Sequence, residues 1–251
     1  QQEQAAQSQS EADADAASGS VVAAQGPAPE KEPVALSDEA VLTRALARAD
    51  FAYPQVRRGD VVIAHTGYSL RYDEAHEQAR WVAYRLTAAR LKKPVKRTDD
   101  FAPDPRVPTG SATPGDYARS GYDRGHLVPS KDRSDTEENN DATFLMTNVI
   151  PQSAACNRGA WEKFERYCRD LAFDGKEVYL AAGPHAAGGV AADGTRKLTI
   201  GRNAPFVTVP AAVWKVALVV DRGANPTKST RTIAVWMPND DTVKEDDWAS
   251  Y

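Results

Sequence analysis

Cysteine is scarce in this chain, which holds only Cys156 and Cys168 among 251 residues. Two thiols are too few for a disulfide framework or for a zinc site built from cysteines. If residues 158–171 are helical, the two thiols lie on the order of 15 Å apart along the axis, whereas a disulfide needs Cα atoms within about 7 Å. We therefore expect both cysteines to be free thiols in the core.

Long apolar runs and an excess of positive charge are also lacking. No stretch of the sequence approaches the roughly 18 apolar residues of a membrane helix, so we expect no membrane partner. The formal net charge is −4, which argues against a uniformly basic surface. Residues 85–133 nevertheless contain eleven Lys or Arg and six Asp. A mildly basic stretch is compatible with a polyanionic partner, although a solvated surface is the simpler explanation.

The beginning of the chain differs in composition from the rest. Residues 1–33 hold two valines and no other large apolar side chain, and they are rich in Gln, Ala, Ser and acid. Such a segment cannot bury enough surface to offset its ordering entropy, so residues 1–35 are predicted to be a disordered acidic tail. Residues 36–251 are compatible with a single domain. Because the chain begins with Gln1, we expect a secreted or periplasmic protein whose signal peptide has been removed.

The remaining pattern predicts an α+β fold in which strands, a helix and further strands follow one another. Helices are expected at residues 37–51, where Ser37 can cap, and at residues 157–172, whose apolar side chains share one face. Residues 81–91 fit either a strand or a helix, and residues 92–121 predict a long irregular loop. Strands are expected at residues 60–64, 67–72, 143–150, 178–182, 206–209, 213–220 and 232–237.

Among the four histidines, His126 has the most unusual context, because Asp123, Arg124 and Gly125 directly precede it. An imidazole can take a proton from water near neutral pH, and a guanidinium can grip a phosphate oxygen. A lone histidine is more often a structural residue. Acid, arginine and imidazole compressed into four residues, however, indicate chemistry on a phosphate ester.

A second group of polar residues lies downstream and consists of Asn148, Gln152, Asn157 and Glu165. Each has a structural explanation when taken alone: Asn157 would cap a helix, and Glu165 would pair with Arg169 on its surface. Being eight residues apart, Asn157 and Glu165 would still share roughly one side of that helix. Oxygen ligands on one side suit Mg²⁺, which keeps most of its waters.

The strings SGYDRGHLVPS and TFLMTNVIPQSAACNRGAWEKFE resemble the DNA/RNA non-specific endonucleases of the ββα-metal superfamily, the Serratia nuclease type. Further matches are WVAYRLT upstream and VYLAAGP, VPAAVWKVAL and AVWMPN downstream, so the resemblance covers roughly residues 60–240. It implies a ββα-metal nuclease fold with a central antiparallel sheet flanked by helices. The implied activity is magnesium-dependent cleavage of DNA and RNA without sequence specificity, with Mn²⁺ as a substitute metal.

The resemblance also implies roles for individual residues. His126 would be the general base, Asn157 the direct ligand of Mg²⁺, and Glu165 the holder of metal-bound waters. Arg85 would stabilise the pentacoordinate phosphate, with Arg124 as its companion. The residues expected to contact the substrate are Arg85, Arg124, Asn148 and Gln152.

Two other functions are compatible with the sequence. One is a nuclease-fold protein that binds nucleic acid but has lost activity, and the other is a nuclease restricted to DNA. The intact set of site residues argues against the first, whereas the sequence does not decide the second. Members of the family usually continue beyond a sequence like the final WASY, with a helical segment after the point corresponding to Tyr251. The oligomeric state is left open, and a homodimer is compatible with the sequence.

Overall fold

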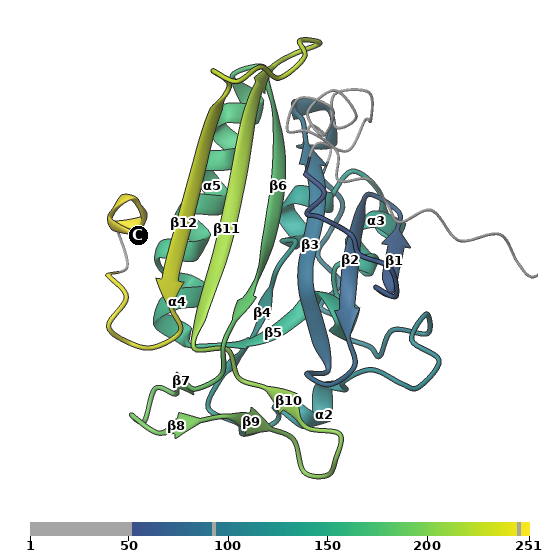
Figure 1. The fold of residues 1–251 in the computed structure, drawn as a ribbon, viewed down its shortest axis with the longest axis vertical. Helices are drawn as coiled ribbons and strands as arrows, with labels where there is room; N and C mark the ends of the chain where they lie inside the picture. Colours follow the sequence, from purple (N-terminus) through teal and green to yellow (C-terminus); the bar gives the residue numbers. More distant parts are fainter. Residues whose placement is uncertain (1–51, 92–93, 245–246) are drawn as a thin grey trace, which may run out of the picture. The chain divides into compact units, whose positions relative to one another are not determined.

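The computed structural model describes residues 52–91, 94–244 and 247–251. The tail predicted at residues 1–35 and the helix predicted at residues 37–51 both lie outside these ranges. The centre of the described part is a six-stranded antiparallel sheet with the order β1-β2-β3-β6-β11-β12 (Figure 1). Its strands are β1 Val62–His65, β2 Tyr68–Asp73, β3 Gln78–Leu86, β6 Lys176–His185, β11 Ala212–Asp221 and β12 Arg231–Pro238. The expected α+β class with a central antiparallel sheet is confirmed.

One face of this sheet is covered by the helix α5 (Ala160–Phe173), which runs alongside β6, β11 and β12 (Figure 1). The apolar side chains Trp161, Phe164 and Cys168 are buried in one cluster with residues of the sheet such as Val213. This is the helix face that the spacing of apolar residues predicts. Burial of that face holds helix and sheet together, and both cysteines are free and buried as expected.

The chain leaves the sheet after β3 and returns to it as β6, where Leu86 and Val178 are paired. The intervening segment contains the hairpin of β4 (Asp123–His126) and β5 (Val149–Gln152), followed by the helix α4 (Ala154–Arg158) and then α5. Its shorter elements are the 3-10 helices η1 Ala88–Leu91, η2 Ser130–Arg133 and η3 Met146–Asn148 and the helices α2 Pro114–Tyr117 and α3 Glu137–Ala142.

Short strands complete the fold after β6. They are β7 Gly189–Val190, β8 Arg196–Lys197, β9 Thr199–Ile200 and β10 Val207–Thr208, and they pair as two separate two-stranded ribbons. The 3-10 helix η4 Trp248–Ser250 lies near the end of the chain. Within the described ranges, no helix has both the length and the apolar character needed to cross a bilayer.

Two element predictions differ from the structure, and one ambiguous segment is resolved by it. The apolar run at residues 143–150 is not one strand, because only its end pairs as β5, while Phe144 and Met146 are buried in a turn and a 3-10 helix. The helix expected at residues 157–172 is two helices, α4 and α5, separated at Gly159. The ambiguous residues 81–91 continue β3 up to Leu86 and then form η1. In the first case burial, rather than sheet pairing, explains the apolar side chains.

The loop predicted before β4 is irregular in its described part, apart from α2, and is tied to the rest of the fold at several points. Ala102 forms an isolated bridge with Leu145. Asp104 lies 3.0 Å from His65 of β1, and it also accepts a hydrogen bond from Thr147 at 2.6 Å. These contacts fix the loop beside the β4–β5 hairpin.

Candidate active site

The motif DRGH forms β4, which pairs with β5 in a short antiparallel hairpin. In this hairpin Gly125 lies opposite Ile150. A Cβ atom on Gly125 would lie 2.2 Å from Oε1 of Gln152, far inside van der Waals contact. Only glycine therefore fits between Arg124 and His126, and the two functional side chains are carried by a tightly closed hairpin.

The imidazole of His126 packs against two phenyl rings. Its centroid lies 5.3 Å from that of Phe101 and 5.1 Å from that of Phe144. Its Nε2 is enclosed and has no hydrogen-bond partner among the described residues. Burial lowers the pKa of His126 to about 3, and the positive charges of Arg97 and Arg124 act in the same direction. The ring is therefore neutral at pH 7 and can accept a proton.

Asn157 lies within α4, whose N-cap is Ser153, so it is not the helix cap that the sequence suggested. Its Nδ2 donates to Oδ2 of Asp123 at 2.9 Å. The neighbouring Arg158 grips both oxygens of the same carboxylate, at 2.7 and 2.5 Å. Asp123 thereby fixes the amide, and Oδ1 of Asn157 accepts no hydrogen bond from the described residues. An oriented amide oxygen of this kind is suited to a hard cation.

A depression of about 490 Å³ brings several of these side chains together. It lies between the loop that precedes α2, the strand β4 and the end of α4. The depression is lined by Asp123 and Arg124 of the DRGH motif and by Asn157 of the downstream motif. Its other charged or aromatic lining residues are Arg97, Asp99, Phe101, Tyr117, Tyr122 and Arg158.

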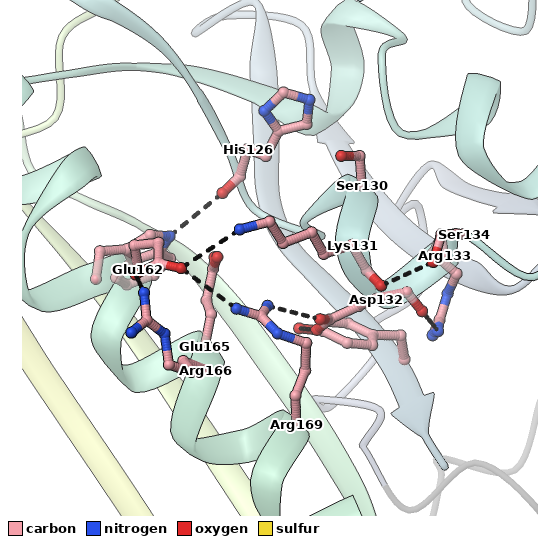
Figure 2. Close-up of polar contacts among 12 residues, drawn as sticks. His126, Ser130, Lys131, Asp132, Arg133, Ser134, Glu162, Glu165, Arg166 and Arg169 are labelled. Carbon is pink, nitrogen blue, oxygen red and sulfur yellow. Dashed lines mark hydrogen bonds and ion pairs between the residues drawn. The ribbon is translucent and has the colours of Figure 1, made fainter. Parts of the chain in front are cut away.

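Glu165 is buried on α5, and its Oε1 accepts a hydrogen bond from Nζ of Lys215 at 2.9 Å. Burial raises the pKa of Glu165, while the charge of Lys215 opposes that rise. The sequence predicts a surface ion pair between Glu165 and Arg169, but the arginine pairs with other carboxylates. Arg169 donates to Asp132 at 3.0 Å and to Glu162 at 3.5 Å (Figure 2). Glu165 is thus buried rather than solvated, and it does not line the depression beside Asn157.

The structure does not place Arg85 with the other site residues. Its side chain is exposed on β3, forms an ion pair with Oε1 of Glu177 at 2.9 Å and lies over the ring of Tyr179. It lines cavities on that part of the sheet and not the depression beside Asn157. The position of Arg85 on β3, directly paired with Tyr179 on β6, accounts for this separation.

Asn148 and Gln152 are fully buried, and their contacts are structural. Oδ1 of Asn148 accepts from the main chain of Val128, and its Nδ2 donates to the carbonyls of Val128 and Thr143, all at 2.9 Å. Nε2 of Gln152 donates to Sγ of Cys156 at 3.2 Å. Asn148 therefore fixes the main chain that follows His126. Neither Asn148 nor Gln152 is exposed to a substrate.

Arg97 and Phe101 are two of the lining residues that the sequence prediction did not single out. Arg97 donates to Asp99 at 2.6 Å and to Ser130 at 3.1 Å, which holds its guanidinium on the site. The ring of Phe101 lies under the guanidinium of Arg124, at 4.1 Å from its centroid. Both come from the irregular loop, where no local pattern distinguishes one arginine of the basic stretch from the next.

The oxygen donors near these motifs are of the kind that a hydrated divalent metal ion uses. Within the described ranges, no three His, Cys, Asp or Glu side chains gather into a group that could hold a metal. Mg²⁺ needs no such group, because it keeps several waters and takes only one or two protein oxygens. The free Oδ1 of Asn157 and the carboxylate of Glu165 are hard oxygen donors of the required kind.

Comparison with known proteins shows which family of sequences the chain matches. The sequence model described as DNA/RNA non-specific endonuclease matches residues 49–251. A nuclease of Nostoc sp. is 42% identical over 190 residues, which is 73% of this chain and 65% of that protein. The mitochondrial nuclease EXOG of Homo sapiens is 30% identical over 222 residues, which is 86% of this chain and 57% of that protein. The chain thus spans less than two thirds of the length of these relatives.

A solved structure shows the same similarity in three dimensions. It is titled as the crystal structure of the EndoG/EndoGI complex and the mechanism of EndoG inhibition. The match has a TM-score of 0.62 and 29% sequence identity, and it covers 77% of this chain and 80% of that one.

Proposed function

Since the chain belongs to the DNA/RNA non-specific endonuclease family and has the ββα-metal nuclease fold, we propose that it is a magnesium-dependent endonuclease that hydrolyses DNA and RNA without sequence specificity. The observation that carries the proposal is the neutral imidazole of His126 beside a depression lined by Arg97 and Arg124. A proton acceptor and two fixed cations are what phosphodiester hydrolysis requires.

His126 is assigned the role of general base. Because Nε2 is enclosed, Nδ1 is the ring nitrogen through which the imidazole can meet a water. Nδ1 takes a proton from that water as its oxygen forms a bond to phosphorus and the bond from phosphorus to the leaving 3′-oxygen breaks. The leaving oxygen then takes a proton from solvent.

Arg97 and Arg124 are assigned to the phosphate. Both guanidiniums are held by neighbours: Arg97 by Asp99 and Ser130, and Arg124 by the ring of Phe101. A planar, permanently charged fork stabilises the negative charge that develops on the phosphate oxygens during attack. In this proposal Arg97 takes the role that the family resemblance implies for Arg85.

Asn157 and Glu165 are the residues that would hold the metal. Asn157 offers an amide oxygen that Asp123 keeps in position, and Glu165 offers a carboxylate for metal-bound water. A bound Mg²⁺, or Mn²⁺ in its place, supplies positive charge at the phosphate and the leaving oxygen. Since one neutral oxygen is the direct ligand, the metal is expected to bind weakly and to be removed by chelators.

Parallel assays on supercoiled plasmid and on RNA, with and without EDTA, test the proposal. We expect metal-dependent cleavage of both substrates and a rate that falls steeply with added salt, because phosphate contacts drive binding. His126→Ala is expected to lose about 10²- to 10⁴-fold in rate, whereas His185→Ala, a histidine on an exposed strand end, serves as control. Binding without cleavage would indicate an inactive binding protein, and intact RNA would indicate a nuclease restricted to DNA.

The relatives include mitochondrial nucleases and a cyanobacterial one. The secreted or periplasmic location therefore stays a prediction from the sequence.

A further inference from the structure

Lys215 lies on the buried face of β11, where the other side chains are apolar. Val213 and Ala217, two residues before and after it, are buried and belong to the core cluster that packs against α5. Lys215 itself is 0% exposed. A lysine in the middle of the buried face of a sheet is unusual, because charged side chains are almost never fully buried unless they are paired.

The position of this lysine is not explained by stability. Removing an ammonium group from water is costly, and a buried ion pair recovers the cost only with good geometry and further hydrogen bonds. Apolar side chains of similar volume at both positions are often as stable or more stable. Such a pair in the core therefore calls for an explanation in terms of what the two charges do.

The contacts of Lys215 point toward the site. Its Nζ lies 2.9 Å from Oε1 of Glu165 and 4.3 Å from the ring centroid of Trp161. Nε1 of Trp161 in turn donates to the carbonyl oxygen of His126 at 3.4 Å. Figure 2 shows Glu165 on the side of α5 that faces the main chain of His126. No hydrogen bond from the described residues reaches the second carboxylate oxygen, Oε2.

We propose that Lys215 is a positioning residue of the active site, which holds Oε1 of Glu165 so that Oε2 is presented to the hydrated cation. The inference rests on the proposed function, because it assigns Glu165 to metal-bound water. Lys215 touches neither substrate nor metal and acts through Glu165. Two charges fixed against each other on α5 and β11 give the carboxylate one orientation, which an apolar neighbour would not.

The test uses the full chain in four forms: wild type, Lys215→Met, Lys215→Arg and the double variant Glu165→Gln/Lys215→Met. Methionine keeps most of the volume of lysine and removes its charge. The readouts are the melting temperature without metal, the Kd for Mn²⁺ alone measured by electron paramagnetic resonance, and the kcat and KM for plasmid cleavage. Val213→Ala on the same face of β11 is the matched control, since it loosens the core without touching Glu165.

We expect Lys215→Met to melt at lower temperature, because it leaves a buried carboxylate unpaired, and to bind Mn²⁺ about 10- to 100-fold more weakly. The double variant should recover the melting temperature without recovering Mn²⁺ affinity or kcat. Lys215→Arg should recover part of the affinity, and Val213→Ala should lower only the melting temperature.

A wild-type Kd for Mn²⁺ and a wild-type kcat in Lys215→Met would overturn the inference, as would recovery of both by the double variant. These outcomes are separate from a failure of the proposed function itself. That failure would appear as a wild-type protein that cleaves neither plasmid nor RNA in the presence of Mg²⁺ or Mn²⁺.

Discussion

At the scale of single residues, the side chains around the depression hold one another in particular charge states and orientations. The rings beside His126 exclude water from one of its nitrogens, and two arginines add positive charge nearby. Asp123 plays the corresponding part for Asn157, whose amide it orients through one hydrogen bond. Both functional side chains therefore depend on neighbouring groups for their charge state or orientation, and this dependence can be measured.

The first prediction concerns the titration of His126. Its folded pKa of about 3 lies below the ordinary value of 6.5. Between these values the unfolded chain takes up a proton that the folded chain does not, so this residue's contribution to stability is present above pH 6.5 and is lost as the pH falls toward 3. An NMR titration should show no change in the His126 ring signals between pH 5 and pH 8. A midpoint near 6.5 would contradict it.

The second prediction concerns Asn157→Asp. A plain helix cap would tolerate this change, because aspartate caps as well as asparagine. Here it would place a carboxylate 2.9 Å from that of Asp123, where the amide now donates. We expect a lower melting temperature and a lower rate at pH 7.

The double variant Asp123→Asn/Asn157→Asp restores a hydrogen bond in the opposite direction and is the control. It should regain part of the melting temperature that the single variant loses, because an amide at position 123 no longer accepts from Arg158 at both of its atoms. If the single variant melts and cleaves like the wild type, the pairing of Asn157 with Asp123 has no role in the site.

At the scale of elements, the site is built on a hairpin and two consecutive helices. The two strands of the hairpin are closely packed at Gly125. Gly125 packs directly against the side chain of Gln152 on the partner strand. The third prediction is that Gly125→Ala destabilises the protein by about 1–3 kcal/mol, the usual cost of overpacking, and lowers the rate by displacing β4. Thermal denaturation and plasmid cleavage measure the two effects.

Gly115→Ala in α2 is the matched control for this substitution. The added Cβ would meet only Oγ1 of Thr113, at 3.4 Å, which is an ordinary contact. Alanine also favours helices over glycine. Equal losses in the two variants would show that the hairpin is not under the steric constraint described here.

How far the sequence predicts these elements depends on whether their cause is local. A short motif and apolar periodicity were enough to single out residues 123–126 and the helix face formed by Trp161 and Phe164, but they did not predict that residues 123–126 form the strand β4. They also did not single out Arg97. The course of an irregular loop, which brings Arg97 to the depression, depends on tertiary contacts such as that between Asp104 and His65. The strand predicted at residues 143–150 failed for a related reason, since burial alone made its sequence apolar.

At the scale of the whole molecule, the described sheet runs from β1 to β12, and the first 35 residues lie outside the described ranges. The fourth prediction is that deleting residues 1–35 leaves the melting temperature and the rate of plasmid cleavage nearly unchanged. The composition of the segment predicts no packed structure, and its acidic charge would repel nucleic acid. A fall of several degrees in the melting temperature would mean that the segment contributes to the folded domain.

The insertion of the whole site between β3 and β6 has a consequence during synthesis. The edge of β3 at Leu86 pairs with Val178, so the ribosome must add about 90 residues before the partner strand exists. At typical rates of roughly 5–20 residues per second, this takes about 5 to 20 s. For that time β3 presents an unpaired edge, which is a template for pairing with another chain. Newly made copies are therefore most prone to associate wrongly while the catalytic segment is still being translated, and slower initiation, which keeps nascent chains apart, should improve the yield of folded protein.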